Sequence, residues 1–419
     1  TVEENGALIV RRWRVDSSPA APVEPFGAPV VEFLPSLQTG WGMSLERTVQ
    51  AMADGAFDPT PRDPRITRIA EQLVGGVPKE KRAERARRLY RWLVNNVEEG
   101  GENDGRRVII GRNGNLWRGY IALCRALEIP IDYGVAKSRL TVPPTGPFSE
   151  SLQFSLPLLR IGVEQGPQWL SFGGKHAPFG YVPAEARGMP ARVFTDQGTE
   201  SATVPADGIV DRVVYKADVQ LEKDGGAEVA LEHTLYGRYA AGLRGALSEM
   251  SEQQIRDVVE SRLVGYALRG ARLKTHSIVN LGAPEQPLVI RTTSHVPAFA
   301  QVAGGVLLVT PPFAPRLGQL AALPARQTPL LLVESTEQEI LLNLKLPAGA
   351  HTPTNVTKGE IRDGDRRIVI HDRVEGGALV LDRKVSLPAG RIQTDAYPKF
   401  ASFARAADDA LSSSIRVKL

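Results

Sequence analysis

The sequence predicts an α+β protein in which a helical part with an antiparallel sheet precedes a β-rich C-terminal region. Apolar residues recur at helical spacing through much of residues 43–130, and a short strand pattern follows directly. From about residue 196 onward, short alternating stretches are separated by turn residues, which is typical of strands. We therefore expect three parts, which are residues 1–42, 43–195 and 196–419.

The composition of the 419-residue chain is that of a globular protein, with 42% hydrophobic and 23% charged residues. The 51 basic and 47 acidic residues leave a net charge of +4, which is too balanced to indicate a nucleic-acid-binding protein. No apolar run approaches the roughly 20 residues that cross a bilayer, so we expect no transmembrane segment. The single cysteine, Cys124, excludes a disulfide within the chain.

The first 97 residues predict a strand, a linker and three helices. Residues 7–15 read as a strand, and residues 17–29 form a Pro-rich connector. This looks like the end of a preceding β domain, so we expect the chain to be part of a larger multidomain protein. Ser44 is a plausible N-cap for a first helix, and helices are expected at 65–74 and 79–97.

A loop at residues 111–115 leads into an apolar helical run, 116–127, which ends before Pro130. The N-terminus of a helix carries partial positive charge and free N–H groups, so a cysteine there would be acidified and nucleophilic. None of the residues from 105 to 123 is cysteine. Strand patterns and a loop follow at residues 131–137, 152–163, 167–172 and 173–188.

The C-terminal region predicts strands with two helical stretches. Residues 213–222 and 227–236 flank a Lys-Asp-Gly-Gly turn, which indicates a hairpin. We expect helices near 239–268 and 397–411, and a closing strand at 414–419. Further strands are expected at residues 272–281, 287–294, 328–346, 356–362, 366–374 and 378–386.

Four motifs lie around the 116–127 helix and the strands after it. Counting 17 residues back from Pro130 reaches Asn113 in Gly-Arg-Asn, and a gapped count reaches Leu116. Later motifs are Phe-Ser-Leu ending at Leu156 and Trp-Leu-Ser ending at Ser171. Residues 177–183 read Ala-Pro-Phe-Gly-Tyr-Val-Pro, with a glycine at position 188. These motifs resemble Gly-Asp-Cys, Phe-Asn-His, Trp-Leu-Asp and Ala-Pro-Phe-Gly-Tyr-Leu-Pro of the bacterial transglutaminase-like superfamily.

The resemblance implies a papain-like core and covers nearly the whole chain. It points to a subgroup in which a β domain precedes the core and a β-rich domain, such as a β-sandwich, follows it. Members of that subgroup are usually exported, so we expect a bacterial protein of the periplasm or cell envelope. Acyl transfer by the family needs a thiolate, an imidazole and a carboxylate or amide. Asn113, Leu156 and Ser171 supply none of these roles, so the sequence predicts a catalytically inactive relative.

Aromatic residues and one histidine are expected to line the former cleft, where they would bind a protein or peptide partner. Core packing is the competing interpretation of the aromatic residues, and a structural spacer is a further hypothesis. The alternative function is a residual or re-invented cysteine-type hydrolase or cross-linker that uses Cys124, or Ser171 with His176. The expected binding residues are Trp117, Trp169, His176, Phe179 and Tyr181.

Other chemistry finds little support in the sequence. The remaining histidines are dispersed among strand patterns, and no pair has the spacing of metal ligands on one helix. A phosphate-binding glycine loop and a Gly-x-Ser-x-Gly nucleophile motif are both missing from the sequence. We therefore expect no metal and no cofactor.

Overall fold

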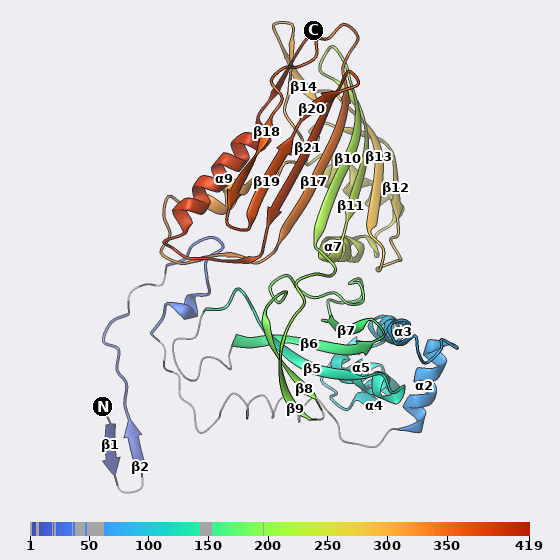
Figure 1. Cartoon of the computed structure of the whole chain (residues 1–419), viewed down its shortest axis with the longest axis vertical. Coiled ribbons are helices and arrows are strands. Elements are labelled where there is room, and N and C mark those ends of the chain that lie inside the picture. Colours follow the sequence, from blue (N-terminus) through green and yellow to red (C-terminus); the bar gives the residue numbers. More distant parts are fainter. Residues whose placement is uncertain are drawn as a thin grey trace.

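A helical N-terminal part is followed by a large β-rich region, so the expected α+β class is confirmed (Figure 1). The computed structural model describes residues 2–5, 8–18, 20, 22–35, 37, 47, 63–142, 153–195 and 197–419. The first expected helix, with Ser44 as its N-cap, lies outside the described residues. None of the helices in the described ranges is long and apolar enough to span a membrane.

The N-terminal segment forms a hairpin and then contacts the C-terminal region. The hairpin strands are β1 (Val2–Asn5) and β2 (Leu8–Arg11), and a short 3-10 helix, η1, spans Val30–Glu32. Between them, Gly27 forms an antiparallel bridge with Leu330. The carboxylate of Glu24 accepts hydrogen bonds from the backbone N–H groups of Gln327 and Thr328, both at 2.9 Å. The connector therefore lies against the last part of the chain.

The core begins with closely packed helices, three of which have a side-chain N-cap. They are α2 (Pro64–Val74), α3 (Arg82–Asn96), α4 (Gly105–Gly111) and α5 (Leu116–Ala126). Asp63 and Asp104 cap α2 and α4 with their side chains. A Cβ atom on Gly105 would lie 2.4 Å from the carbonyl oxygen of Arg118, so only glycine lets α4 pack this closely against α5.

Five antiparallel strands complete the core, in the order β7-β6-β5-β8-β9. Tyr133, Leu159 and Leu170 face α5 and join its hydrophobic cluster. Their neighbours Leu158 and Trp169 face the other side, because side chains alternate along a strand. The strands are β5 (Ile131–Lys137), β6 (Phe154–Val163), β7 (Gly166–Leu170), β8 (Pro190–Thr195) and β9 (Gly198–Thr203), and a small parallel pair joins β3 (Glu98–Glu99) to β4 (Asn113–Gly114).

The C-terminal region is built on a nine-stranded sheet with the order β12-β13-β11-β10-β17-β21-β19-β18, in which β20 pairs with β21. Its strands are β10 (Arg212–Leu221), β11 (Ala227–Leu235), β12 (Arg272–Val279), β13 (Leu288–Val296), β17 (Thr336–Lys345), β18 (Lys358–Asp363), β19 (Arg366–His371), β20 (Arg373–Glu375) and β21 (Ala378–Leu387). The pair β10 and β17 is parallel, and the other pairs are antiparallel. Smaller sheets contain β14 (Ala300–Ala303), β15 (Val306–Val309) and β23 (Ile415–Lys418), and β16 (Leu330–Leu332) with β22 (Gly390–Ile392).

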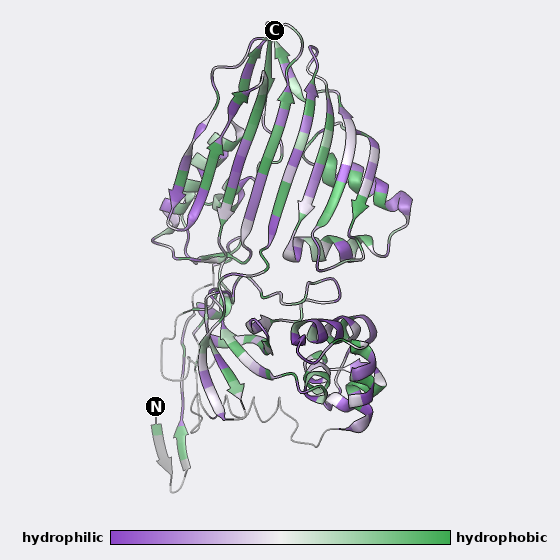
Figure 2. Ribbon diagram, turned by 45° about the vertical axis from the view of Figure 1, so that its right-hand side comes forward, coloured by the Kyte–Doolittle hydropathy of each residue, from purple (hydrophilic) through white to green (hydrophobic). Residues whose placement is uncertain are grey.

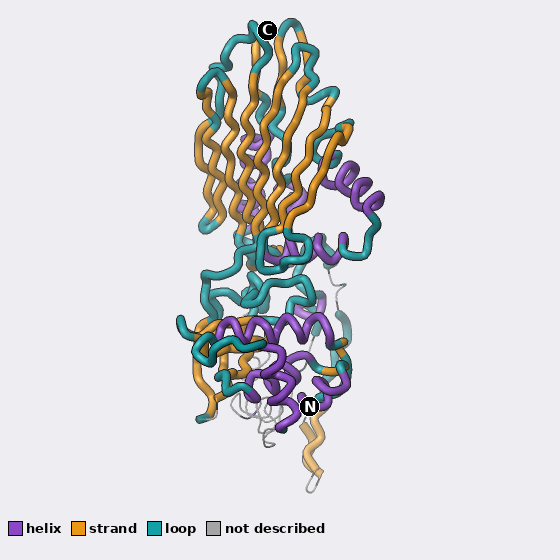
Figure 3. The backbone as a smooth tube through the Cα atoms, turned by 90° about the vertical axis from the view of Figure 1, so that its right-hand side faces the viewer, coloured by secondary structure: helices purple, strands orange, loops and turns teal. Residues whose placement is uncertain are grey.

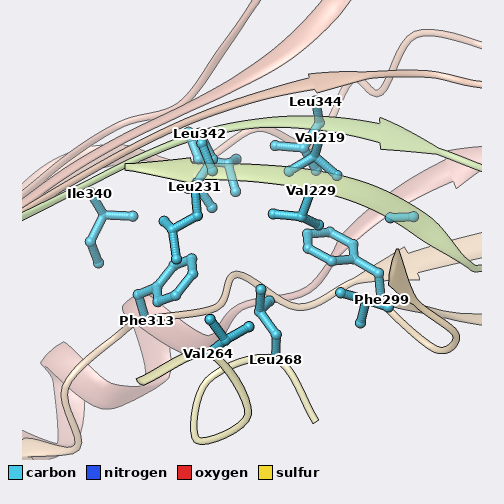
Figure 4. Close-up of a cluster of buried hydrophobic side chains, with 14 of the residues drawn as sticks. Val219, Val229, Leu231, Val264, Leu268, Phe299, Phe313, Ile340, Leu342 and Leu344 are labelled. Carbon is cyan, nitrogen blue, oxygen red and sulfur yellow. The ribbon is translucent and has the colours of Figure 1, made fainter. Parts of the chain in front are cut away.

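Helices cover one face of this sheet (Figure 3). They are α7 (Gly237–Leu247), α8 (Glu252–Val258), the π-helix η2 (Val259–Val264), the 3-10 helix η3 (Leu317–Ala321) and α9 (Tyr397–Ser412). Hydrophilic and hydrophobic residues alternate along its strands (Figure 2). The apolar side chains form the core beneath the sheet, where Leu231, Val264 and Phe313 meet (Figure 4).

Several local features differ from the sequence-based expectation, and the strand expected at 328–346 is two strands, β16 and β17, in different sheets. The helix expected at 239–268 is divided after Leu247, because Ser251 and Gln254 form a capping box that starts a new helix. Helix α4 was not expected at all.

A buried ion pair lies on the nine-stranded sheet. The fully buried Arg383 donates two hydrogen bonds to Asp372 and one to the carbonyl oxygen of Leu411 in α9.

Candidate functional site

The start of α5 carries no group that can act as a nucleophile. Asn115 is its N-cap, and the side-chain oxygen accepts hydrogen bonds from the backbone N–H groups of Trp117 and Arg118 at 3.0 and 3.5 Å. Leu116 is the first helical residue and is partly buried. Asn113 precedes the cap by two residues and lies exposed in β4. The gapped count from Pro130 therefore reaches the helix start, whereas the ungapped count reaches β4.

Cys124 lies far along α5, inside the helical core. Its side chain is fully buried, and burial raises the pKa of the thiol to about 12. Because the thiolate is the reactive form of cysteine, almost none of it exists at pH 7. In this environment Cys124 acts as a small apolar core residue.

The other two positions that the sequence analysis singled out lie on the sheet side of the core. Leu156 is paired with Ala136 and packs with the cluster on the face away from α5. Ser171 is buried after β7, where its hydroxyl donates to the carbonyl oxygen of Tyr181 at 3.1 Å. Leu156 is apolar and the Ser171 hydroxyl is bonded to the backbone, so neither position supplies an imidazole or a carboxylate.

An aromatic cluster lies beside the first turn of α5. The ring of Trp117 is 5.0 Å from that of Phe172 and 6.0 Å from that of Tyr133. Beneath them, Tyr90 contacts Phe172 at 5.4 Å and Phe179 at 5.6 Å. We call Trp117, Tyr133 and Phe172 the aromatic surface, because each is partly exposed while Tyr90 and Phe179 are buried.

Two of the expected binding residues, Trp117 and Phe179, meet in this cluster, whereas Trp169 does not. Trp169 is buried on the opposite face of the sheet, where it packs with Leu158 and Val193. Tyr133 was missed as a site residue in the sequence. The alternation along residues 131–137 is the signal that could have found it, because it places Tyr133 on the same face as Ile131.

Tyr181 lies at the joint between the core and the C-terminal region. Its hydroxyl donates to Oδ2 of Asp211 at 3.1 Å. The backbone N–H of Arg238, at the start of α7, donates to Oδ1 of Asp211 at 2.8 Å, and the Arg187 guanidinium lies 3.5 Å from Oδ2. Asp211 is fully buried, and burial raises its pKa despite these three partners. This carboxylate therefore connects the loop of residues 173–188 with α7.

His176 lies at the same joint, near α7. Its ring is 3.5 Å from the position that a Cβ atom on Gly245 would take. Burial lowers the pKa of His176, and the neighbouring cations Lys175 and Arg244 lower it further. Next to it, Arg91 of α3 donates to the carbonyl oxygen of Ala177 at 2.6 Å and forms a 2.6 Å ion pair with Glu285. The loop around His176 is thus fixed between the two regions.

A group of metal-type ligands occurs in the C-terminal region, away from α5. Within the described residues, ligand atoms of Glu222, Glu228 and His295 lie within 4.8 Å of one another. Glu228 already forms an ion pair with Lys274 at 2.6 Å and a 3.2 Å contact with His295. Lys274 therefore already neutralises Glu228, the carboxylate that also contacts His295.

Comparisons with known proteins identify the fold. No protein-family model matches the chain, and no curated protein matches it. The chain is similar to a crystal structure described as a "putative protease" from Parabacteroides distasonis, with 11% identity, a TM-score of 0.50 and coverage of 90% of this chain and 59% of that one. A "putative cysteine protease" from Cytophaga hutchinsonii matches at 18% identity with a TM-score of 0.21, covering 38% of this chain and 57% of that one. The chain spans less than two thirds of either protein, and the first likeness shows a protease-like fold.

Proposed function

We propose that this chain is a catalytically inactive, transglutaminase-like module that binds an extended protein or peptide segment. The observation that carries this proposal is the start of α5, where Asn115 caps the helix and Leu116 and Trp117 follow. A cysteine-dependent enzyme of this fold needs its thiolate at that position. The one thiol of the chain is instead buried at Cys124, with a pKa of about 12.

The aromatic surface supports the binding part of the proposal. Trp117 contacts both Tyr133 and Phe172, and all three are partly exposed, next to backbone N–H groups of the first turn of α5. Aromatic side chains bury a large area at a small cost in conformational entropy, and they are enriched at binding hot spots. An extended segment with an apolar side chain would place that side chain against these rings.

We also propose a location in the cell envelope of a bacterium, which follows from the resemblance to an exported subgroup. The partner would then be an envelope protein or a cell-wall peptide. Fractionation of the native organism tests this location independently of binding. Recovery of the chain with the cytoplasmic fraction alone would contradict it.

The binding proposal is tested with fluorescein-labelled random decapeptides and with a cell-wall stem peptide, measured by fluorescence anisotropy. We expect saturable binding to the wild-type chain. Replacing Trp117 by alanine should weaken it at least tenfold, because hot-spot aromatic residues contribute about 2 kcal/mol or more. Trp169→Phe is the matched control, since Trp169 is buried on the other face of the sheet.

Four outcomes separate the hypotheses. Binding that Trp117→Ala weakens and Trp169→Phe leaves unchanged supports the proposal. Saturable binding that is equal in both variants would place the ligand elsewhere. No binding at all would favour a structural spacer, and cleavage or cross-linking of the peptides would favour the alternative of a residual enzyme.

A further inference from the structure

Three uncharged polar side chains of two neighbouring strands lie on the apolar face of the nine-stranded sheet. His233 lies in β11, and Thr292 and Ser294 lie in β13. Their exposed fractions are 6%, 4% and 0%. They are surrounded by the largest hydrophobic cluster of the C-terminal region, so water of the bulk solvent does not reach them.

The register of β11 and β13 brings these side chains together. Leu231 and Val229 pair with Thr292 and Ser294, and His233 pairs with Ile290, the next inward-facing residue of β13. Side chains that alternate to the same face of paired strands lie about 5 Å apart directly and about 7–8 Å apart on the diagonal. Thr292 is thus the diagonal neighbour of His233 and lies two residues from Ser294 on the same face, so the three form a row with Thr292 in the middle, which we call the buried polar patch.

Each residue of the buried polar patch has an atom without a partner. Among the residues that the structure describes, Nε2 of His233, Oγ1 of Thr292 and Oγ of Ser294 have no hydrogen-bond partner. The imidazole ring is fixed by stacking on Tyr215 at 4.4 Å, and Tyr215 stacks in turn on Phe313. Burial lowers the pKa of His233 to about 4, so the ring is neutral at pH 7.

Residues of the helical layer of the C-terminal region pack against this face of the sheet. Val264 of η2 and Leu268 lie opposite Val229 and Leu231, the strand partners of Ser294 and Thr292 (Figure 4). η2 is a π-helix, a form with an irregular backbone that is frequent at functional sites. η2 thus belongs to the same hydrophobic cluster as Val229 and Leu231, the strand partners of two residues of the patch.

We propose that the buried polar patch binds one or more ordered water molecules between the sheet and η2. Native proteins leave few buried hydroxyl groups unpaired, and internal water commonly satisfies them with two to four hydrogen bonds. A hydroxyl group can donate and accept, and a neutral imidazole nitrogen can do one of these, so the three atoms suit a small neutral ligand. An ion would lack a counter-charge there, which makes water the favoured occupant. This inference does not rest on the proposed function.

The test compares Thr292→Val and Ser294→Ala with Thr293→Val in thermal unfolding. Thr293 precedes Ser294 but faces the open side of the sheet, where its hydroxyl contacts Thr275 at 2.6 Å, so it is the matched control. If water fills the hydrogen bonds, the two inward variants should lower the Tm by about 2–6 °C and more than the control does. If the hydroxyl groups are truly unpaired, their removal should leave the Tm unchanged or raise it, which would overturn the proposal.

A second measurement uses the unaltered chain and so does not depend on the folding of a variant. Oxygen-17 magnetic relaxation dispersion detects water that stays in a protein for longer than bulk exchange allows. A crystal structure at high resolution should also show water within 3.2 Å of at least two of the three atoms, a normal hydrogen-bond distance. Clear density for the side chains with no water between them would refute the proposal.

Discussion

A cysteine placed at the cap of α5 should become acidic and reactive. In Asn115→Cys the sulfur would replace the oxygen that accepts from the N–H groups of Trp117 and Arg118. Both hydrogen bonds and the helix dipole favour the thiolate, so the pKa should fall from about 8.5 to roughly 7 or below. At pH 7 about half of the introduced thiol would then be thiolate.

Cys124 supplies an internal reference in the same variant. With a pKa of about 12, its thiolate fraction at pH 7 is on the order of 10⁻⁵, so the introduced cysteine should react at least about 10⁴ times faster. Iodoacetamide labelling from pH 5 to 10, read by peptide mass spectrometry, measures both sites at once. Asn115→Ser, which keeps a capping side chain, controls for loss of the cap.

Two outcomes would refute this reasoning. One is an introduced thiol that titrates at 8.5 or above, since the start of α5 would then give no electrostatic assistance. The other is labelling of Cys124 in the native wild-type chain at a comparable rate. The second result would mean that the burial of Cys124 does not protect it.

Two further predictions concern buried ionisable groups. Burial lowers the pKa of His233 from 6.5 to about 4, so its ring stays neutral in the folded protein. The unfolded chain takes up a proton at this histidine below pH 6.5, and the folded protein does not. The free energy of unfolding therefore falls as the pH drops from 6.5 towards 4. The loss should reach about 3 kcal/mol. In denaturant unfolding between pH 4 and 7, the stability of His233→Phe should depend less on pH than that of the wild-type chain. Identical pH profiles of the two proteins would refute this prediction. Asp211→Ala should increase hydrogen exchange at residues 173–188 without raising it in β21, because it removes the acceptor for Tyr181; unchanged exchange would contradict this role.

Much of the architecture follows from local patterns in the sequence. The apolar face expected at residues 79–97 is the buried face of α3, including Leu89 and Leu93, because a helix buries residues three and four apart. The turn after Glu222 likewise joins two strands, β10 and β11, as expected from its glycines. Such features depend on neighbours in the chain.

Other features depend on contacts between distant segments. The parallel pairing of β10 with β17 joins strands that lie far apart in the sequence, and no local pattern specifies it. Helix α4 has only seven residues and contains two glycines, so its intrinsic propensity is low; it forms because Gly105 allows contact with α5. Trp169 lies on the face of the five-stranded sheet that points away from α5, so it does not join Trp117 in the aromatic cluster.

The candidate site was only partly accessible from the sequence. The sequence shows directly that no cysteine precedes Cys124. Which residue takes the position of a nucleophile depends on where α5 begins, and the structure gives that. The count to Asn113 missed that point because β4 lies between α4 and α5. The roles of Tyr181 and His176 at the joint depend on Asp211 and α7, which come from another part of the chain.

The most direct test is an assay of acyl transfer and peptide hydrolysis by the wild-type chain. Purified protein is incubated with a peptide library and an amine donor, and products are followed by mass spectrometry beside Cys124→Ala. We expect no covalent product from either protein above the uncatalysed rate. Turnover by the wild-type chain that disappears in Cys124→Ala would contradict the assignment of an inactive module.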